Sequence, residues 1–186
     1  MGSDDAELIQ RWQRGEAAAF EAVVRRWQEP LGRFLVRLVG RADLAQDLCQ
    51  EVFLRVYLAG PKYQEAGTFS GWLYRIALNI ARDASRRHRL NSQPWPTIEP
   101  AAKAPTAVAD CERRELIQIV EKALAELPAS QREVLVLRHY EGMRFEEMAR
   151  LLGVPASTLK SRFAAALQRM RVRLEQLGWS HEETES

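Results

Sequence analysis

The sequence predicts an all-α protein with two small helical domains joined by a flexible linker, the second domain containing a helix-turn-helix. Apolar residues recur at helical spacing along most of the chain, and no segment alternates apolar and polar residues as a strand does. Four of the eight prolines fall between Asn91 and Ala109, among small and polar residues, which favours an extended linker. Farther along, Gly153 separates two short helical patterns, and such a tight turn is typical of a helix-turn-helix.

The composition is that of a soluble globular protein. Of the 186 residues, 46% are hydrophobic and 28% are charged. No apolar run is long enough to cross a bilayer, and the acidic, polar start of the chain does not resemble a signal peptide, so we expect a cytoplasmic protein. Cys49 and Cys111 lie inside helical patterns and have no His or Cys at ligand spacing, which predicts reduced, structural thiols. A net charge of +2 identifies no partner, but acids and bases are segregated along the chain.

The first forty residues predict three helices. The spacing Asp4–Glu7 matches a capping box for a first helix, which Gly15 ends. A second helix is predicted over Phe20–Trp27, ending before Pro30, and a third over Leu31–Val39. The aromatic residues in these helices recur at core spacing, so we expect them to be buried rather than to stack on nucleic-acid bases.

A fourth helix, Ala42–Leu58, has two different faces. Its apolar stripe has i, i+4 spacing and consists of Leu44, Leu48, Val52 and Val56. Another side carries three acids and no base, and consists of Asp43, Asp47, Gln50, Glu51 and Leu54. Composition alone favours a solvated acidic face. The alternative is a docking surface for a basic partner helix, with Leu54 and Phe53 as exposed apolar anchors.

After a loop at Gly60–Gly67, a long helix is predicted over Thr68–Leu90. We expect its core side to contain Trp72, Ile76 and Ile80. The other faces carry polar and basic groups from Tyr74, Arg75, Asn79, Arg82, Arg86 and Arg87. Aromatic rings beside arginines suit single-stranded nucleic acid, because bases stack on rings and phosphates pair with guanidinium groups. A single tryptophan in a helix is nevertheless more often a core residue.

The second domain is predicted to begin near Asp110 with a helix that ends before Pro128. Its apolar residues recur at helical spacing and are Leu116, Ile119, Val120, Ala123, Leu124 and Leu127. Ser130 and Glu133 match a second capping box, which opens a helix that Gly142 ends. From Gly178 onward the chain is acidic, and we expect a frayed tail.

The helix-turn-helix is predicted from both spacing and charge. Its first helix carries Phe145, Met148, Ala149 and Leu152 on one face; Pro155 opens a second helix that buries Leu159, Phe163 and Leu167. The exposed residues of the second helix are Thr158, Lys160, Ser161 and Arg162. From Ser157 to Leu174 the segment holds five basic residues and no acid, which suits a major groove lined with phosphates. The alternative is a helical hairpin with a solvated basic face; spacing and charge together favour DNA.

The sequence contains no pattern that indicates catalysis. His88, His139 and His181 are scattered, and none pairs with a Cys or carboxylate at metal-ligand or triad spacing. The chain has no glycine-rich phosphate-binding loop. We therefore expect a binding protein rather than an enzyme, with no metal and no cofactor.

Three segments, in this order, resemble the bacterial RNA polymerase sigma factors of the sigma-70 family. They read DLAQDLCQEVFLRVY at 43–57, FSGWLYRIALNIARDASRR at 69–87 and LPASQREVLVLRHYEGMRFEEMARLLGVPASTLKSR at 127–162. The match is to the compact extracytoplasmic-function (ECF) class, which keeps only the second and fourth sigma domains. It covers nearly the whole chain.

The resemblance implies a role for each part of the chain. Residues 1–90 correspond to a region 2-like domain that binds core polymerase, recognises the −10 promoter element and melts it. Residues 91–110 form the Pro-rich linker, which in this family threads through polymerase channels. Residues 111–178 correspond to a region 4-like helix-turn-helix domain that recognises the −35 element, and 179–186 to an acidic tail.

The resemblance also implies three sets of site residues. Core polymerase binding falls to residues of the acidic helix, namely Asp47, Gln50, Glu51, Phe53 and Leu54. Recognition of the −10 element falls to the next helix and the loop before it, namely Lys62, Phe69, Trp72, Tyr74, Arg75, Asn79, Arg82, Arg86 and Arg87. Recognition of the −35 element falls to the helix-turn-helix, namely Arg144, Ser157, Thr158, Lys160, Ser161 and Arg162.

The implied partners are core RNA polymerase through its β′ clamp helices, promoter DNA and an anti-sigma factor. The promoter is expected to be duplex at −35 and single-stranded at −10. One departure from the family follows Arg162, where Phe163–Ala166 replaces a further basic or bulky residue. Short side chains there leave more of the −35 recognition to Lys160, Ser161 and Arg162 and to DNA shape.

Two other functions remain open from the residues alone. A two-domain regulator that binds an operator as a dimer would explain the helix-turn-helix, but not the acidic helix or the aromatic and arginine-rich helix. A helical adaptor that binds only protein would leave the basic recognition helix unexplained.

Overall fold

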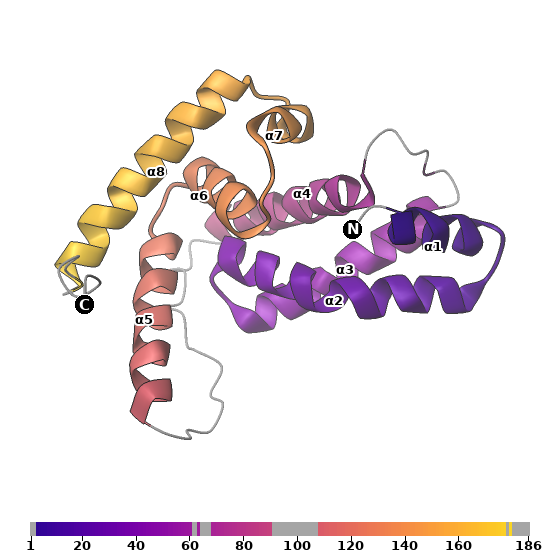
Figure 1. Ribbon diagram of the computed structural model, residues 1–186, viewed down its shortest axis with the longest axis horizontal. Coiled ribbons are helices and arrows are strands. Elements are labelled where there is room, and N and C mark those ends of the chain that lie inside the picture. Colours follow the sequence, from indigo (N-terminus) through magenta and orange to yellow (C-terminus); the bar gives the residue numbers. More distant parts are fainter. Residues whose placement is uncertain (1–2, 61–62, 64–67, 91–107, 178, 180–186) are drawn as a thin grey trace. The chain divides into compact units, whose positions relative to one another are not determined.

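The described residues of the computed structural model, 3–60, 63, 68–90, 108–177 and 179, form helices and their connections (Figure 1). The helices fall into two compact units, with α1 to α4 in the first and α5 to α8 in the second. The predicted all-α fold class is confirmed. Most of the predicted linker and tail lies outside the described residues. Within the described part of the chain, no helix has the length and apolarity needed to span a membrane.

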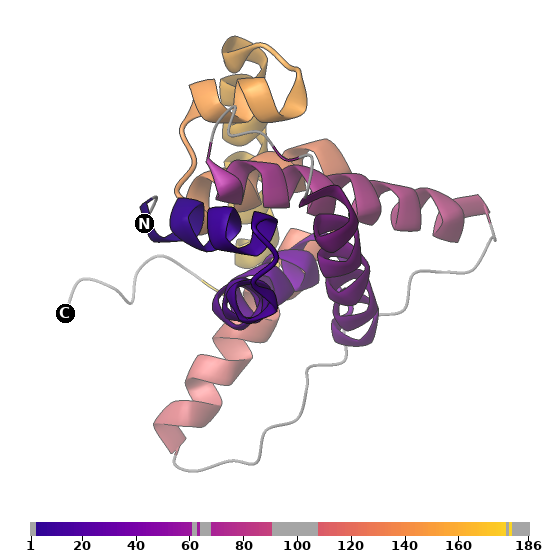
Figure 2. The same ribbon diagram turned by 90° about the vertical axis from the view of Figure 1, so that its right-hand side faces the viewer.

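The first unit opens with a helical hairpin. Helix α1 spans Ser3–Gln13 and packs against α2, Ala17–Val39 (Figure 2). Gly15 lies between them with φ 98°, a left-handed conformation that suits glycine. The Asp4 side chain lies outside the described side chains, so the first capping box is not described. The next residue, Asp5, is buried and accepts a hydrogen bond from Trp27 Nε1 at 3.2 Å.

The expected break at Pro30 is wrong, because α2 continues through it as one helix. A proline inside a helix costs about 3 kcal/mol through a missing hydrogen bond and a ring clash. On the two sides of Pro30, however, Trp27, Leu31 and Phe34 are all buried on the same face of the helix. Burial of each such side chain stabilises the fold by roughly 1.5–3 kcal/mol. The free energy gained by burying the three side chains on one continuous helix therefore exceeds the cost of the proline.

Helix α3 spans Ala42–Ala59 and α4 spans Phe69–Leu90, close to their predicted bounds. The buried residues of α3 are Ala45, Leu48, Val52, Phe53 and Val56. The predicted stripe is therefore confirmed at Leu48, Val52 and Val56, whereas Leu44 is only half-buried.

The core face of α4 differs from the expected one. Ile80 is buried as predicted, but Trp72 and Ile76 are half-buried and Tyr74 is buried. The Tyr74 ring lies edge-on to Trp27, with centroids 6.0 Å apart, and tilted against Phe34 at 4.6 Å. The aromatic surface of α2 therefore decides which ring of α4 enters the core.

The second unit consists of α5 (Val108–Ala125), α6 (Ala129–Leu135), the π-helical turn η2 (Val136–Tyr140), α7 (Phe145–Leu152) and α8 (Ala156–Gln176). Helix α8 packs against α5, α6 and α7. Gly142 follows η2 with φ 66°, in agreement with the predicted helix end.

The capping box predicted at Ser130 and Glu133 is wrong. The N-cap of α6 is Pro128 and has no side-chain hydrogen bond, and Glu133 is buried. Instead, Arg132 turns back and donates from Nη2 to the carbonyl oxygens of Ala125 and, at 3.0 Å, of Leu127. Burial of Arg132 lowers its pKa, an effect that the charge of Glu133 opposes. The junction between α5 and α6 is thus stabilised by a guanidinium group that bonds the carbonyl oxygens at the end of α5.

Candidate nucleic-acid interface

Helix α3 presents the acidic and apolar face that the sequence predicts. Asp47 and Gln50 are exposed, and half-buried Glu51 pairs with Arg55 Nη2 at 2.6 Å. Leu54 is 57% exposed. The ring of Phe53, expected to be an exposed anchor, is buried and faces the core.

Two exposed apolar residues on α3 escaped the sequence analysis. Tyr57 and Leu58 are 53% and 69% exposed and follow Leu54 at i+3 and i+4. This spacing places the three side chains on one patch beside the acids. The same helical count that identified Leu54 could have found both of them. Exposed, contiguous apolar side chains next to charges are typical of a protein-binding surface.

Helix α4 carries a polar and basic stripe. Arg75, Asn79, Arg82 and Arg86 are exposed and follow one another at intervals of four, three and four residues. That interval keeps them on one side of the helix, with exposed Arg87 beside it. Arg86 also pairs with Asp83 at 2.9 Å. Of the six residues expected to give this helix its polar and basic faces, the structure therefore brings five together, and the sixth, Tyr74, is buried.

The aromatic residues expected to face DNA divide into two groups. Phe69 and Tyr74 are buried, whereas Trp72 is half-buried at the start of α4. Trp72 packs against Tyr63, with ring centroids 4.4 Å apart. Tyr63 lies in the loop before α4, where it had no periodic pattern that could single it out. Lys62, the predicted basic residue beside it, lies outside the described residues.

The start of α4 is held by a local cap. Thr68 Oγ1 accepts a hydrogen bond from the Gly71 N–H at 3.2 Å, and the Thr68 carbonyl accepts one from the Trp72 N–H, also at 3.2 Å. The first bond satisfies one of the N–H groups that a helix start leaves unpaired, and the second is the first regular backbone bond of α4. The Trp72 ring therefore projects from an ordered first turn.

Helices α7 and α8 form the predicted helix-turn-helix. The Arg144 N–H donates to Glu147 Oε2 at 2.7 Å and starts α7, and Gly153, with φ 67°, ends it. Met148 and Leu159 are fully buried where the two helices meet. Each boundary follows from a local rule: a carboxylate at the helix start and a left-handed glycine at its end.

The buried face of α8 follows a different course from the predicted one. Leu167, expected in the core, is 46% exposed, whereas Ala166 and Met170 are buried. Together with Leu159 and half-buried Phe163, the buried positions follow intervals of four, three and four residues. A strict repeat of four drifts off the face of a helix with 3.6 residues per turn, and for this reason the prediction of Leu167 failed.

The predicted −35 residues lie at the N-terminal end of α8 and before α7. Arg144, Ser157, Lys160 and Ser161 are exposed, and Thr158 and Arg162 are half-buried. Ser161 Oγ donates to the Thr158 carbonyl at 2.9 Å, so its hydroxyl lies along the helix.

Arg138, on η2, belongs to the same basic cluster and was missed. Its guanidinium carbon lies 5.4 Å from the centre of the Phe145 ring, and Lys160 Nζ lies 5.8 Å from the same centre. Arg138 also donates to the Met143 carbonyl at 3.3 Å. It precedes the helix-turn-helix by a few residues, so no count within that motif would have found it. Its placement enlarges the positive surface around Phe145.

Farther along α8 the arginines contact other side chains of the same unit. Arg169 donates to Gln131 Oε1 at 3.0 Å, and Arg171 pairs with Glu175 at 3.0 Å. Arg173 binds Glu126 through two nitrogens, each contact being 2.7 Å long. The basic residues of Ser157–Leu174 therefore fall into two groups, and those at the C-terminal end contact side chains of their own unit.

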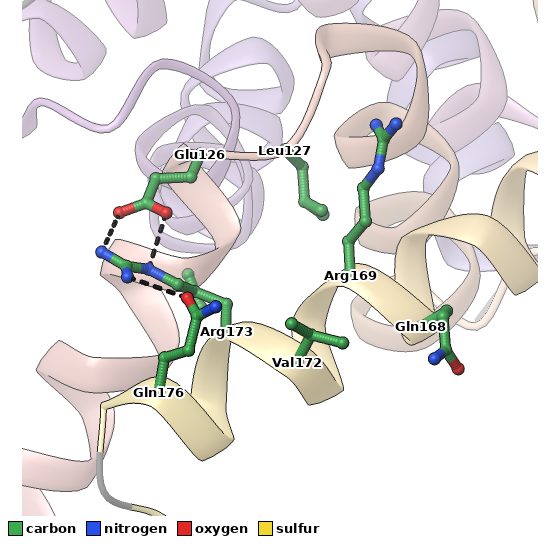
Figure 3. A pocket seen from close by; sticks show the side chains of 8 residues that line it. Glu126, Leu127, Gln168, Arg169, Val172, Arg173 and Gln176 are labelled. Carbon is green, nitrogen blue, oxygen red and sulfur yellow. Dashed lines mark hydrogen bonds and ion pairs between the residues drawn. The ribbon is translucent and has the colours of Figure 1, made fainter.

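Figure 3 shows the groove beside these contacts, about 280 Å³ in volume. It lies where the end of α5 meets the second half of α8, with Glu126 facing Arg173. Within the described residues, no group of three or more His, Cys, Asp or Glu side chains is placed to hold a metal ion.

Comparison with known proteins agrees with this arrangement. Residues 23–90 match the family model for Sigma-70 region 2, and residues 117–170 match the one for Sigma-70, region 4. The RNA polymerase sigma-H factor of Pseudomonas aeruginosa is 32% identical over 183 residues, covering 93% of this chain and 95% of that protein. The ECF RNA polymerase sigma-E factor of Escherichia coli K12 is 31% identical over 172 residues, covering 87% and 90%.

A solved structure is also similar. The sigma factor RpoE of Bartonella quintana, crystallised with the anti-sigma factor NepR, superposes with a TM-score of 0.67 at 25% identity. The similarity covers 84% of this chain and 96% of that one. Since the sequence matches include both helical units and nearly the full length of the relatives, the chain belongs to the sigma-70 family of RNA polymerase sigma factors, in its extracytoplasmic-function class.

Proposed function

We propose that this sigma factor binds core RNA polymerase through α3, the −10 promoter strand through α4 and the −35 duplex through α7 and α8. The observation that carries the proposal is the coexistence, in one chain, of two different nucleic-acid surfaces. One combines a basic stripe with a half-exposed tryptophan, and the other is a helix-turn-helix with a basic N-terminal end. A protein that only reads duplex operator DNA has no need for the first surface.

The acidic and apolar patch of α3 is the proposed contact with the β′ clamp helices of polymerase. Asp47 and Glu51 supply charge that attracts a basic partner, and Leu54, Tyr57 and Leu58 supply apolar area. The charges speed and orient the encounter, while desolvation of the apolar side chains holds the complex. In this proposal the buried ring of Phe53 packs in the core and so holds α3 in position.

The stripe of α4 is the proposed contact with the −10 element. A base that leaves the duplex costs a few kcal/mol, which stacking and a protein pocket offset. Trp72 provides a ring for stacking, Asn79 can hydrogen-bond a base edge, and Arg75, Arg82 and Arg86 can bind phosphates. Phe69 and Tyr74 are assigned a supporting role here, since both rings are buried.

The N-terminal end of α8 is the proposed reader of the −35 element. Lys160 and Arg162 can reach guanine edges or phosphates in the major groove, and Ser157, Thr158 and Ser161 can add hydrogen bonds. Arg144 and Arg138 flank this end and suit phosphate contacts, which fix the register of the helix on the duplex.

Further proposals follow from the family. In this proposal residues 1–90 bind core polymerase and the −10 element, and residues 91–110 form the linker. Residues 111–178 bind the −35 element, and residues 179–186 form the tail. The protein acts by binding rather than by catalysis, and it works in the cytoplasm beside polymerase. Because the Bartonella quintana relative was solved with an anti-sigma factor, a partner of this kind is proposed to regulate this chain also.

Reconstitution with core polymerase tests the proposal. Footprinting the holoenzyme on genomic DNA should protect sites with a fixed separation between two elements, and transcription should start downstream of them. A two-domain regulator that binds an operator as a dimer would protect palindromic sites without polymerase. A helical adaptor that binds only protein would protect no site. If folded protein and core enzyme do not co-migrate at low salt, the proposed function is wrong.

A further inference from the structure

The end of α1 is hydrogen-bonded to the segment that leads into α4. Gln13 Nε2 donates to the Gly60 carbonyl at 2.8 Å and to the Tyr63 carbonyl at 2.9 Å. The Tyr63 N–H in turn donates to the Gly60 carbonyl at 3.0 Å. One amide group therefore bonds the carbonyl oxygens of Gly60 and Tyr63, which lie almost fifty residues farther along the chain.

A close packing contact adds to these bonds. Trp12 lies against Gly60 so tightly that a Cβ atom on Gly60 would stand 1.7 Å from Trp12 Cη2. Trp12 also packs on Phe20 and Tyr57, with ring centroids 4.7 and 6.0 Å apart. Gly60 is thus held by the α1 tryptophan from one side and by the α1 glutamine from another.

The Tyr63 ring lies against the first turn of α4. Its ring centroid lies 4.4 Å from that of Trp72 and 6.3 Å from that of Phe69. Phe69 is buried, so the exposed aromatic surface at this end of α4 is shared by the half-buried rings of Tyr63 and Trp72. The position of the Tyr63 ring depends on its own backbone, which Gln13 bonds.

We propose that Gln13 is a positioning residue for −10 recognition, acting through Tyr63. By fixing the Tyr63 carbonyl, Gln13 keeps the Tyr63 ring against Trp72 and so completes the aromatic surface on which an unpaired −10 base stacks. The inference rests on the proposed function of α4. It assigns part of strand recognition to α1, a helix that carries none of the site residues expected from the sequence.

The chemistry of Gln13 makes this role separable from folding. Gln13 is an exposed residue, and its contribution comes from two N–H donors rather than from buried area. In Gln13→Glu the side chain keeps its shape but loses both donors, and a carboxylate then faces two carbonyl oxygens. In Gln13→Ala the donors are removed without added charge. Gln10→Glu, on the exposed side of the same helix, is the matched control.

The test uses full-length protein bound to core polymerase. The probe is a fluorescein-labelled single strand covering the −10 segment of a promoter found by footprinting. Both Gln13 variants should bind this strand about tenfold more weakly, as expected when two hydrogen bonds that order the site are removed. Affinity for core polymerase and for a −35 duplex should stay within about twofold of wild type, as should all affinities of Gln10→Glu.

A double-mutant cycle with Tyr63→Ala separates positioning from general stabilisation. If Gln13 acts through the Tyr63 ring, Gln13→Glu should weaken strand binding by less than about twofold once that ring is removed. The inference is wrong if the effects of Gln13→Glu and Tyr63→Ala on strand affinity multiply. It is also wrong if both Gln13 variants bind the strand with wild-type affinity, or if the affinities for the strand, core polymerase and the −35 duplex all decrease equally. If the wild-type holoenzyme itself fails to bind the strand, the proposed function of α4 is at fault.

Discussion

At the scale of single residues, Gly60 shows how a side chain can be excluded by a contact that is remote in sequence. Its backbone conformation is one that other residues adopt, yet Trp12 occupies the space that a Cβ atom would need. In a packed interior an added methyl group forces side chains or backbone to shift. The glycine is therefore required by close approach rather than by its φ angle.

We expect Gly60→Ala to lower the free energy of unfolding by roughly 1–3 kcal/mol, because Trp12 must move. Urea denaturation followed by circular dichroism measures the change. Gly32→Ala is the matched control: nothing lies within 4 Å of the added Cβ. Since Gly32 lies inside α2, alanine there should stabilise by about 0.5–1 kcal/mol. Equal effects at the two sites would contradict the steric argument.

Cys49 offers a prediction about pH. It is half-buried, its Sγ lies 3.9 Å from the Gln28 carbonyl, and burial raises the pKa of its thiol above the ordinary value of a cysteine. The folded state thus holds this proton more tightly than the unfolded state does. Stability should therefore be full below the unfolded pKa and should fall as the pH rises through the folded pKa.

The measurement is urea denaturation between pH 7 and pH 10 in a Cys111→Ser background. Replacing Cys49 as well, by alanine, should make the loss of stability at alkaline pH smaller. If the two proteins lose stability in parallel as the pH rises, the thiol of Cys49 is not the cause.

At the scale of single helices, the exposed face of α3 predicts the effect of charge reversal. Replacing Asp47 and Glu51 by lysine should weaken association with core polymerase at least tenfold, because like charges then face the basic partner. The α2 acids Glu21 and Glu29 are also exposed, and reversing both is the matched control. Sedimentation or fluorescence anisotropy with core enzyme measures the affinity. Equal affinities of the two double variants would refute the α3 docking face.

The recognition helix predicts a second effect. Replacing Lys160 or Arg162 by alanine should weaken binding to a −35 duplex by roughly 1–3 kcal/mol where the side chain hydrogen-bonds a base edge. Where the side chain binds a phosphate instead, the slope of log K against log salt concentration should become shallower by about one unit. Arg171→Ala is the control, because Arg171 pairs with Glu175 on the C-terminal half of α8. Wild-type affinity in both test variants would refute the recognition-helix assignment.

At the scale of the whole molecule, two compact units predict independent binding surfaces. If the two surfaces act independently, the free energies of substitutions in separate units should add within about 0.5 kcal/mol. Asn79→Ala should weaken binding of the −10 strand and leave −35 duplex binding unchanged, and Lys160→Ala should do the reverse. Titrating each variant with both probes measures this. A decrease in both affinities in either variant would contradict the division of roles.

Much of this architecture could be predicted from local pattern. The all-α class, the helix-turn-helix and the polar stripe from Arg75 to Arg86 all follow from the 3.6-residue period, which needs only neighbouring residues. Glycine at the helix ends is equally local, as at Gly153. The misses came where packing overrides such rules, for example at Pro30 within α2 and at Ser130, which caps nothing.

Periodicity and composition are properties of short stretches, so they were enough to predict the helical segments, their family and the helix faces that carry charge. The burial of Tyr74 in place of Trp72, and the bond from Gln13 to the backbone of Tyr63, became visible in the folded chain alone. Those choices depend on residues far apart in the chain whose shapes and donors must fit one another. The pattern of neighbouring residues in the sequence does not contain this information.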